Sequence, residues 1–239
     1  MKIVLLGKPA AGKGTLAAEI SRAYNLPIVS VGDILREHIK NGTEFGKTFK
    51  AYVNKGMLAP DEYVIEMVMS DMQKEEYKNG CILDGFSRTI EQAKLLKDVD
   101  MAIEISATDE QVLYGMSGRW NNKFTKGIWH ESHKGFKLIK GLGLLEKRTD
   151  DNMESFKTRL ALYNERAPEI AEFYKKQGKL FTIDNSLVWD KPALIKVVND
   201  ELVKRGLVKK KANLCERFIG SLAKMCKIND DKDRVKELS

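Results

Sequence analysis

Short apolar runs alternate along most of the chain with longer segments in which apolar residues recur every three or four positions. The continuous apolar runs predict five buried strands, at residues 2–6, 27–30, 81–84, 101–105 and 180–183. The periodic segments predict helices at residues 13–24, 32–40, 61–77, 89–97, 109–119 and 191–204. Strands separated by helices favour an α/β fold, in which a parallel sheet is flanked by helices on both faces.

Two segments interrupt this alternation. Residues 43–59 read as a helical insertion between strands, and residues 121–147 combine glycines and aromatic residues without a clear period. A loop of that length without secondary structure is unusual in a compact domain and tends to act as a lid.

A glycine-rich segment, GKPAAGKGT at residues 7–15, follows the first strand and opens the first helix. Glycines let the backbone wrap around phosphates, and the N–H groups at the start of the helix point toward them. Lys13 adds a cation for the β and γ phosphates. Gly14 stands where the usual loop has Ser or Thr, and Thr15 comes one position later. The segment predicts a phosphate-binding P-loop that holds a nucleoside triphosphate.

The composition is that of a soluble globular protein, with 43% hydrophobic and 31% charged residues in a chain of 239. The first strand leads directly into the P-loop, which leaves no room for a signal peptide. The three cysteines, Cys81, Cys215 and Cys226, are scattered, which indicates reduced thiols and argues against a cysteine-bound zinc. We therefore expect a cytoplasmic protein without structural zinc.

The net charge of +7 is concentrated at the C-terminus. Residues 205–239 carry ten Lys/Arg and five Asp/Glu, whereas the rest of the chain has 31 and 29. The main part of the chain therefore shows no sign of specific nucleic-acid binding. Leu214, Phe218, Leu222 and Met225 predict a basic amphipathic helix in the tail. This helix packs on the rest of the protein, contacts a partner or an anionic membrane surface, or makes a non-specific nucleic-acid contact.

The P-loop resembles that of the nucleoside-monophosphate kinases, adenylate kinase above all, and the resemblance continues to about residue 204. Five further segments match motifs of that family in the same order: SVGDILR (30–36), GMLAPDE (56–62), LDGFSRTIEQA (83–93), GRW (118–120) and KRTDD…TRLALY (147–163). The resemblance implies that a monomer transfers the terminal phosphoryl group from ATP to AMP, with Mg²⁺, giving two ADP. It also implies a core (1–29, 60–118, 152–204), an NMP-binding segment (30–59), a lid (119–151) and an extension (205–239). Both inserted segments are expected to close over the nucleotides.

Phosphoryl transfer between two nucleotides concentrates negative charge in a small volume, so several fixed cations must converge. The candidates at motif positions are Lys13, Arg36, Arg88, Arg119, Arg148 and Arg159. The resemblance gives all of these except Arg36 a catalytic role. Arg148 and Arg159 would share a face if they lay on one continuous helix, because their spacing is close to three turns.

The resemblance further divides the remaining site residues between the two nucleotides. It implies an ATP site made by Ala10, Ala11, Gly12, Lys13, Gly14, Thr15, Arg119, Ile128, Trp129 and Lys191. It implies an AMP site made by Val31, Arg36, Met57, Leu58, Ala59, Gly85, Phe86, Ser87, Arg88, Gln92, Arg148 and Arg159. An amide such as Gln92 can donate and accept at once, which suits an adenine edge and favours AMP over UMP or CMP.

Two carboxylates follow strands at the end where open α/β sheets bind ligands. With Gly14 in the hydroxyl position, Asp33 and Asp84 would hold Mg²⁺ through bound water. For Asp33 a plain role at the start of a helix remains equally open.

Four positions depart from the family pattern. Val31 replaces a Thr beside the acceptor base, which loosens base selectivity, and Ser87 replaces a Pro, which is expected to loosen the loop before Arg88. Ala10 replaces a glycine and is tolerable only with a negative φ. Gly115 replaces an Arg that stacks on the adenine of ATP, so Trp120 or the lid aromatics are expected to compensate.

These departures keep other functions open. One alternative is a UMP/CMP or broad-specificity kinase that also takes dAMP. Another is a nucleotide-binding regulatory protein that has lost turnover, although the retained Lys13 and arginines argue against it. His130 and His133 form too weak a pattern for a metal site, so packing within the lid is favoured.

Overall fold

The computed structural model describes residues 1–124, 127–147 and 151–209. The chain divides into two compact units, Met1–Trp189 and Asp190–Ser239, which are described separately. The first unit holds the sheet, the P-loop and both inserted segments. In the second, the described residues contain α9 (Lys191–Lys204), whose bounds match the prediction. The predicted amphipathic helix at 214–225 lies outside the described residues.

Five parallel strands form the central sheet. They are β1 (Lys2–Gly7), β2 (Ile28–Ser30), β3 (Cys81–Asp84), β4 (Met101–Ser106) and β8 (Leu180–Asp184), in the order β2-β3-β1-β4-β8. Most of their residues are apolar because helices cover the sheet on both faces. This arrangement confirms the predicted strands and the α/β class. Because all five strands are parallel, their carboxyl ends meet at one edge, where the P-loop begins.

The helices that follow these strands are α1 (Lys13–Tyr24), α2 (Val31–Lys40), α4 (Asp61–Asp71), α5 (Ile90–Leu95) and α6 (Asp109–Ser117). Three predicted helices were too long. The one predicted at 89–97 is helical only over Ile90–Leu95. The chain leaves α4 at Asp71 and continues through a short 3-10 helix, η1 (Glu75–Tyr77), because the polar residues 73–76 carry no apolar face into the core. Gly118 ends α6, so Arg119 belongs to a strand and not to that helix.

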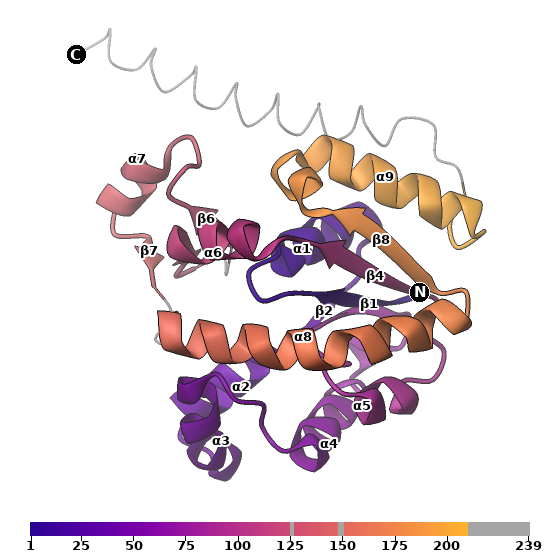
Figure 1. Ribbon diagram of the computed structural model, residues 1–239, viewed down its shortest axis with the longest axis horizontal. Coiled ribbons are helices and arrows are strands. Elements are labelled where there is room, and N and C mark those ends of the chain that lie inside the picture. The colour runs from indigo at the N-terminus through magenta and orange to yellow at the C-terminus, as the bar shows by residue number, and fades with distance from the viewer. Residues whose placement is uncertain (125–126, 148–150, 210–239) are drawn as a thin grey trace, which may run out of the picture. The chain divides into compact units, whose positions relative to one another are not determined.

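The longest described helix, α8 (Met153–Lys176), crosses one side of the sheet and runs past the inserted helices (Figure 1). Ile170 and Tyr174 on α8 belong to a buried cluster with Val4, Leu83 and Phe86. Burial of this apolar face, at about 25 cal/mol per Å², holds α8 against the sheet. The helix therefore carries a fixed row of side chains along the binding edge.

The first inserted segment contains α3 (Glu44–Lys55), as the sequence predicted. Its cap residue Thr43 accepts a hydrogen bond from the N–H of Gly46, and Phe45 and Phe49 pack with Tyr63 of α4. The segment returns to the core at Gly56, which lies against the backbone of Ser155 in the first turn of α8. The return point is thus fixed by a close approach between two backbones.

The second inserted segment is not the unstructured loop that the sequence predicted. It forms an antiparallel sheet of β5 (Arg119–Asn122), β6 (Ile128–His130) and β7 (Leu145–Glu146), in the order β6-β5-β7, with α7 (Phe136–Gly141) between the last two strands. The strands have two to four residues each, too few to establish an alternating pattern in the sequence.

None of the helices in the described ranges combines the length and apolarity that a membrane crossing requires.

We expect Gly56→Ala to destabilise the protein more than Gly42→Ala. Both glycines have φ near +65° to +70°, so alanine costs about 1–2 kcal/mol at each in the left-handed region. An added Cβ at Gly56 would lie 2.2 Å from the carbonyl oxygen of Ser155, whereas nothing lies within 4 Å at Gly42. Overpacking should add about 1–3 kcal/mol at Gly56 alone. Urea unfolding of both variants measures the difference, and equal losses would contradict the close approach.

Candidate functional site

The P-loop holds the ammonium group of Lys13 against its own backbone. Lys13 Nζ donates to the carbonyl oxygens of Gly7, at 2.6 Å, and Lys8, at 2.8 Å. Gly12 takes φ +99°, which places the first N–H groups of α1 toward the loop interior. The loop is therefore folded as an anion cradle whose cation already lies inside it.

Ala10 adopts φ +62°, so the expectation of a negative φ was wrong. A left-handed conformation costs a non-glycine residue about 1–2 kcal/mol, which the surrounding contacts must offset. Two such contacts come from the 3-10 helix η2 (Asn185–Trp189): Asn185 Nδ2 donates to the carbonyl of Ala11 at 2.7 Å, and Val188 packs on Gly12. No sequence motif pointed to Asn185, although it is a polar residue directly after a strand, and a similar position singled out Asp84.

Gly14 leaves room for the lid. A Cβ at this position would lie 2.8 Å from Cδ1 of Ile128, on β6. The usual Ser or Thr would therefore displace Ile128. The contact brings this predicted ATP-site residue onto the P-loop, with Trp129 next to it on the same strand.

Four of the predicted cations lie close enough to act on one another electrostatically. Burial lowers the pKa of Lys13 to about 8, the charge of Asp84 opposes this shift, and the charges of Arg88, Arg119 and Arg159 add to it. Arg119 is itself held by both carboxylate oxygens of Asp151, and both side chains are largely buried. The site thus assembles like charges before any ligand is present.

The other two predicted cations are placed differently. Arg36 pairs with Asp33 on the same helix, at 2.5 Å, and does not line the pocket next to the P-loop that is described below. Arg148 lies outside the described residues. Because α8 begins at Met153, with Asn152 as its cap, the helix on which Arg148 and Arg159 would share a face does not reach Arg148.

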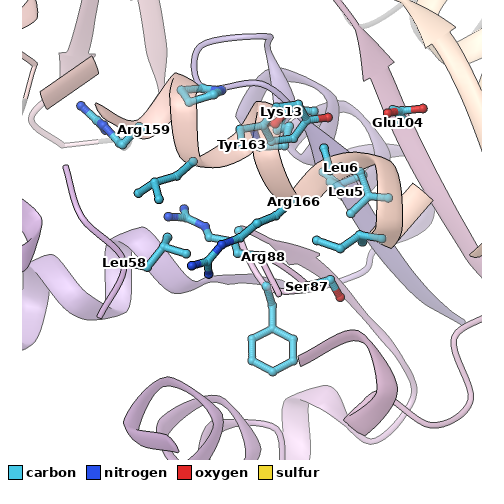
Figure 2. Close-up of a pocket in the computed structure, with 17 residues that line it drawn as sticks. Leu5, Leu6, Lys13, Leu58, Ser87, Arg88, Glu104, Arg159, Tyr163 and Arg166 are labelled. Carbon is cyan, nitrogen blue, oxygen red and sulfur yellow. The ribbon is translucent and has the colours of Figure 1, made fainter. Parts of the chain in front are cut away.

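The pocket next to the P-loop is drawn in Figure 2. It is lined by residues from β1, the P-loop, the loop after β3, β4 and α8: Leu5, Leu6, Gly7, Pro9, Lys13, Leu58, Gly85, Phe86, Ser87, Arg88, Glu104, Arg159, Leu162, Tyr163, Arg166, Ala167 and Ile170. Of the predicted AMP-site residues it brings together six: Leu58, Gly85, Phe86, Ser87, Arg88 and Arg159. Val31 and Ala59 are buried and Met57 is exposed, and none of these three lines the pocket.

Arg88 is positioned by a hydrogen-bonded network that the sequence analysis did not find. Its backbone N–H donates to Oε1 of Gln92 at 2.9 Å, and Nε2 of Gln92 donates to Asp61 at 2.7 Å. Asp61 also accepts from the hydroxyl of Thr89 at 2.6 Å. Gln92 is buried and its amide is engaged on both sides, so it supports Arg88 here and does not line the pocket. The sequence signal that could have pointed to Asp61 is its place in the GMLAPDE segment.

Ser87 does not loosen the loop in the way expected. It is buried with φ +67°, a conformation that proline cannot adopt, and its hydroxyl lies 2.9 Å from the hydroxyl of Tyr174 on α8. The loop before Arg88 is thus tethered to α8 through a side chain that proline lacks.

Two of the departures on the donor side are neighbours. A Cβ at Gly115 would lie 3.0 Å from the carbonyl oxygen of Ala10, so the missing side chain leaves room for the altered loop. Trp120 is engaged within the lid, where Lys140 lies 4.3 Å above its ring. The aromatic rings beside Gly115 are instead those of Tyr114 and Trp189, both about half exposed.

The two lid histidines pack in this same aromatic group. His130 is buried, its Nε2 lies 3.0 Å from the carbonyl of Tyr114, and its ring covers Gly118. His133 accepts the N–H of His130 at 3.1 Å. No cluster of three or more His, Cys, Asp or Glu able to hold a metal occurs within residues 1–124, 127–147 and 151–209.

The carboxylates near the P-loop fit a magnesium ion that is bound together with a phosphate ligand. Asp84 Oδ2 lies 3.9 Å from the position a Cβ would take at Gly14, and Asp33 follows β2, whose Ser30 is the strand partner of Asp84. Mg²⁺ commonly takes one or two carboxylates, with waters and substrate phosphates completing its coordination. Asp84 meets this requirement directly, whereas Asp33 is already paired with Arg36.

These features define the class of the protein. A P-loop at the carboxyl edge of a parallel sheet, with a buried lysine, converging arginines and a nearby carboxylate, is a phosphoryl-transfer site. A family model described as adenylate kinase matches residues 5–179. The chain is 40% identical over 205 residues to an adenylate kinase of Agathobacter rectalis, covering 80% of this chain and 94% of the relative.

Other curated relatives have the same name. An adenylate kinase of Caldicellulosiruptor saccharolyticus is 42% identical over 195 residues, with 76% of this chain and 90% of the relative covered. One from Archaeoglobus fulgidus is 35% identical over 198 residues, with 78% and 91% covered. The chain belongs to the adenylate kinase family, and it is a nucleoside-monophosphate kinase.

The lowered pKa of Lys13 predicts a pH dependence of stability. The group's pKa is about 8 in the folded protein and 10.5 ordinarily, so between these values the unfolded chain binds more protons. This residue's contribution therefore makes the folded state more stable as pH rises from 8 to 10.5. The difference in unfolding free energy between wild type and Lys13→Met should shift in favour of wild type over that range. Urea unfolding at several pH values tests this, and a constant difference would contradict it.

Proposed function

We propose that this enzyme catalyses the reversible, Mg²⁺-dependent transfer of the terminal phosphoryl group of ATP to AMP, giving two ADP. The observation that carries the proposal is the convergence of Arg88, Arg119 and Arg159 on Lys13, three of these four cations lining one pocket. Four cations in a small volume repel one another, and the charge that best neutralises them is that of several phosphates at once.

On the donor side, the backbone N–H groups from Ala10 to Thr15 hold the triphosphate, with Lys13 between the β and γ phosphates. Ile128 and Trp129 cover the P-loop from the lid. The close approach of Ile128 to Gly14 supports this placement. Tyr114 and Trp189 offer rings for the donor base in place of the missing arginine at Gly115. Lys191, at the start of α9, remains a proposed ATP-site residue.

On the acceptor side, Arg88 binds the monophosphate. Its guanidinium lies over Gly85, where a Cβ would come 2.9 Å from Nη2. Leu58 and Phe86 offer apolar surface, and Gln92 with Asp61 fixes the backbone from which Arg88 extends. Arg36 joins this site after leaving Asp33, and Arg148 is assigned to the transferring group by its motif.

The chemical step moves the γ-phosphoryl group from one oxygen to another. An oxygen of the acceptor phosphate forms a bond to the γ phosphorus while the bond to the β–γ bridging oxygen breaks, and the bridging electrons stay on ADP. Lys13, Arg119 and Arg159 stabilise the negative charge that spreads over the transferring oxygens. Mg²⁺, held through Asp84 and Asp33, would neutralise charge on the β and γ phosphates when bound.

Water must be excluded, because it would otherwise accept the phosphoryl group. We infer that residues 30–59 close over the acceptor and residues 119–151 over the donor, around a core of 1–29, 60–118 and 152–204. The ion pair of Arg119 with Asp151 joins the two ends of the proposed lid. The lid can then move as a unit while Arg119 stays in the site.

The working unit is proposed to be one chain in the cytoplasm, with residues 205–239 as a separate extension. A single chain supplies all four converging cations. Cys81 is a free, buried thiol, in keeping with a reducing compartment.

A second candidate is a kinase with broad acceptor specificity. The side-chain amide of Gln92 is already hydrogen-bonded to Arg88 and Asp61, and Val31 lacks a hydroxyl. Few polar groups therefore remain to recognise the acceptor base. Weak base recognition would admit dAMP, UMP or CMP at reduced efficiency.

An acceptor panel distinguishes these functions. ADP formation from Mg-ATP with AMP, dAMP, UMP or CMP is followed in a coupled assay, and we expect the highest kcat/KM with AMP. Preference for UMP or CMP would contradict AMP as the acceptor. If no acceptor is turned over, the protein binds nucleotide without catalysis, and the proposal fails.

Loss of a converging cation should reduce turnover severely. Lys13→Ala and Arg88→Ala are each expected to lower kcat/KM for ATP and AMP by about 10²–10⁴-fold, because each removes charge that the transferring phosphate needs. Lys47→Ala serves as the control, since Lys47 is exposed and pairs with the exposed Glu44 at 2.7 Å. A mild effect of both site substitutions would show that the cations do not act together.

A further inference from the structure

Arg166 lies in the pocket although no sequence motif pointed to it. It is on α8, seven residues or about two turns after Arg159, and is half-buried. Arg159, Leu162, Tyr163, Arg166, Ala167 and Ile170 recur at three- and four-residue spacing and form one face of α8 along the pocket. Burial of Ile170 and Tyr174 against the sheet fixes this face, so the helix cannot rotate the base of Arg166 away from the pocket without unpacking.

The pocket carries an excess of positive charge. Its lining contains the cations Lys13, Arg88, Arg159 and Arg166, and one carboxylate, Glu104. Glu104 is already engaged, because it accepts a hydrogen bond from Thr182 at 3.2 Å and one from the hydroxyl of Tyr163. Burial and this carboxylate raise the pKa of Tyr163, which keeps its hydroxyl protonated as the donor.

Arg166 has no such partner within the part of the chain that the structure describes: neither an ion pair nor a hydrogen bond holds its guanidinium. Arg36, which the sequence assigned to the acceptor phosphate, is in contrast paired with Asp33 and absent from the pocket lining. A half-buried guanidinium has five donors to satisfy, and a phosphate matches its planar geometry with two parallel hydrogen bonds. In Figure 2 the side chain of Arg166 extends from α8 to the side of the pocket where Arg88 and Leu58 lie.

We propose that Arg166 is a phosphate-binding residue of the acceptor site. From α8 it binds the monophosphate, while Arg88 binds the same phosphate from the loop after β3. This inference rests on the proposed function, since it takes the pocket to be the acceptor site. With Arg166 in this role, the acceptor is recognised more by its phosphate than by its base. The base-reading groups are few, because Gln92 is engaged and Val31 has no hydroxyl, whereas the phosphate meets at least two arginines.

The test compares Arg166→Gln, Arg166→Lys and, as control, Lys157→Gln, an exposed residue of the same helix. Calorimetric binding of AMP alone gives a Kd that does not depend on turnover. A hydrogen-bonded charge is worth about 1.5–3 kcal/mol, so Arg166→Gln should weaken AMP about 10- to 100-fold. Arg166→Lys should fall between it and wild type, and Lys157→Gln should leave the Kd unchanged.

Two further readouts separate binding from a structural effect. The loss should be the same factor for AMP, UMP and CMP, because the phosphate is common to all three, and the KM for ATP should stay unchanged. An unchanged Kd for AMP in Arg166→Gln overturns the proposal, as does a loss confined to ATP. If no monophosphate is turned over but AMP binding still depends on Arg166, the proposed function fails and this inference stands. If Arg166→Gln does not fold, the Kd of Arg166→Lys for AMP decides. A wild-type Kd in that variant overturns the proposal.

Discussion

The buried ammonium group of Lys13 is the interaction around which the rest of the structure is arranged. It is held by two carbonyl oxygens of its own loop, and burial together with three nearby guanidinium groups makes its charge costly, as its pKa of about 8 records. Phosphate binding removes that cost. A site that is strained by like charges without ligand is selective for polyanions, because a neutral or singly charged molecule cannot relieve the repulsion.

Holding these cations together requires supports that do not themselves touch a phosphate. Asp151 fixes Arg119 by an ion pair, while Asp61 and Gln92 fix the backbone of Arg88. Asn185 and Val188 hold the P-loop from the end of β8. A polar group that bonds the backbone of a site residue limits its motion, and this preorganisation is what electrostatic catalysis needs.

Two of the four departures from the family pattern, Ala10 and Gly115, contact each other, and a third, Ser87, has a partner on α8. Ala10 takes a left-handed conformation, and its carbonyl occupies the space that the absent side chain of Gly115 leaves. Ser87, in a conformation closed to proline, gains a hydroxyl partner in Tyr174. On the acceptor side, the proposed use of Arg166 similarly accompanies the pairing of Arg36 with Asp33.

The sequence alone determined the parallel sheet, the P-loop and where most helices begin, because apolar periodicity and glycine placement are local signals that burial preserves. It did not predict α8, the longest described helix. It also identified the cations, since their motifs are contiguous. It failed for the lid, whose strands are too short to show a period, and for the sign of φ at Ala10, which neighbours decide. Only the tertiary structure decided which cations meet, because a guanidinium can pair locally, as Arg36 does with Asp33, or reach a distant pocket, as Arg166 does from α8. That choice depends on which helix face is buried and on which carboxylates lie within reach, and both are set by packing between segments far apart in the chain.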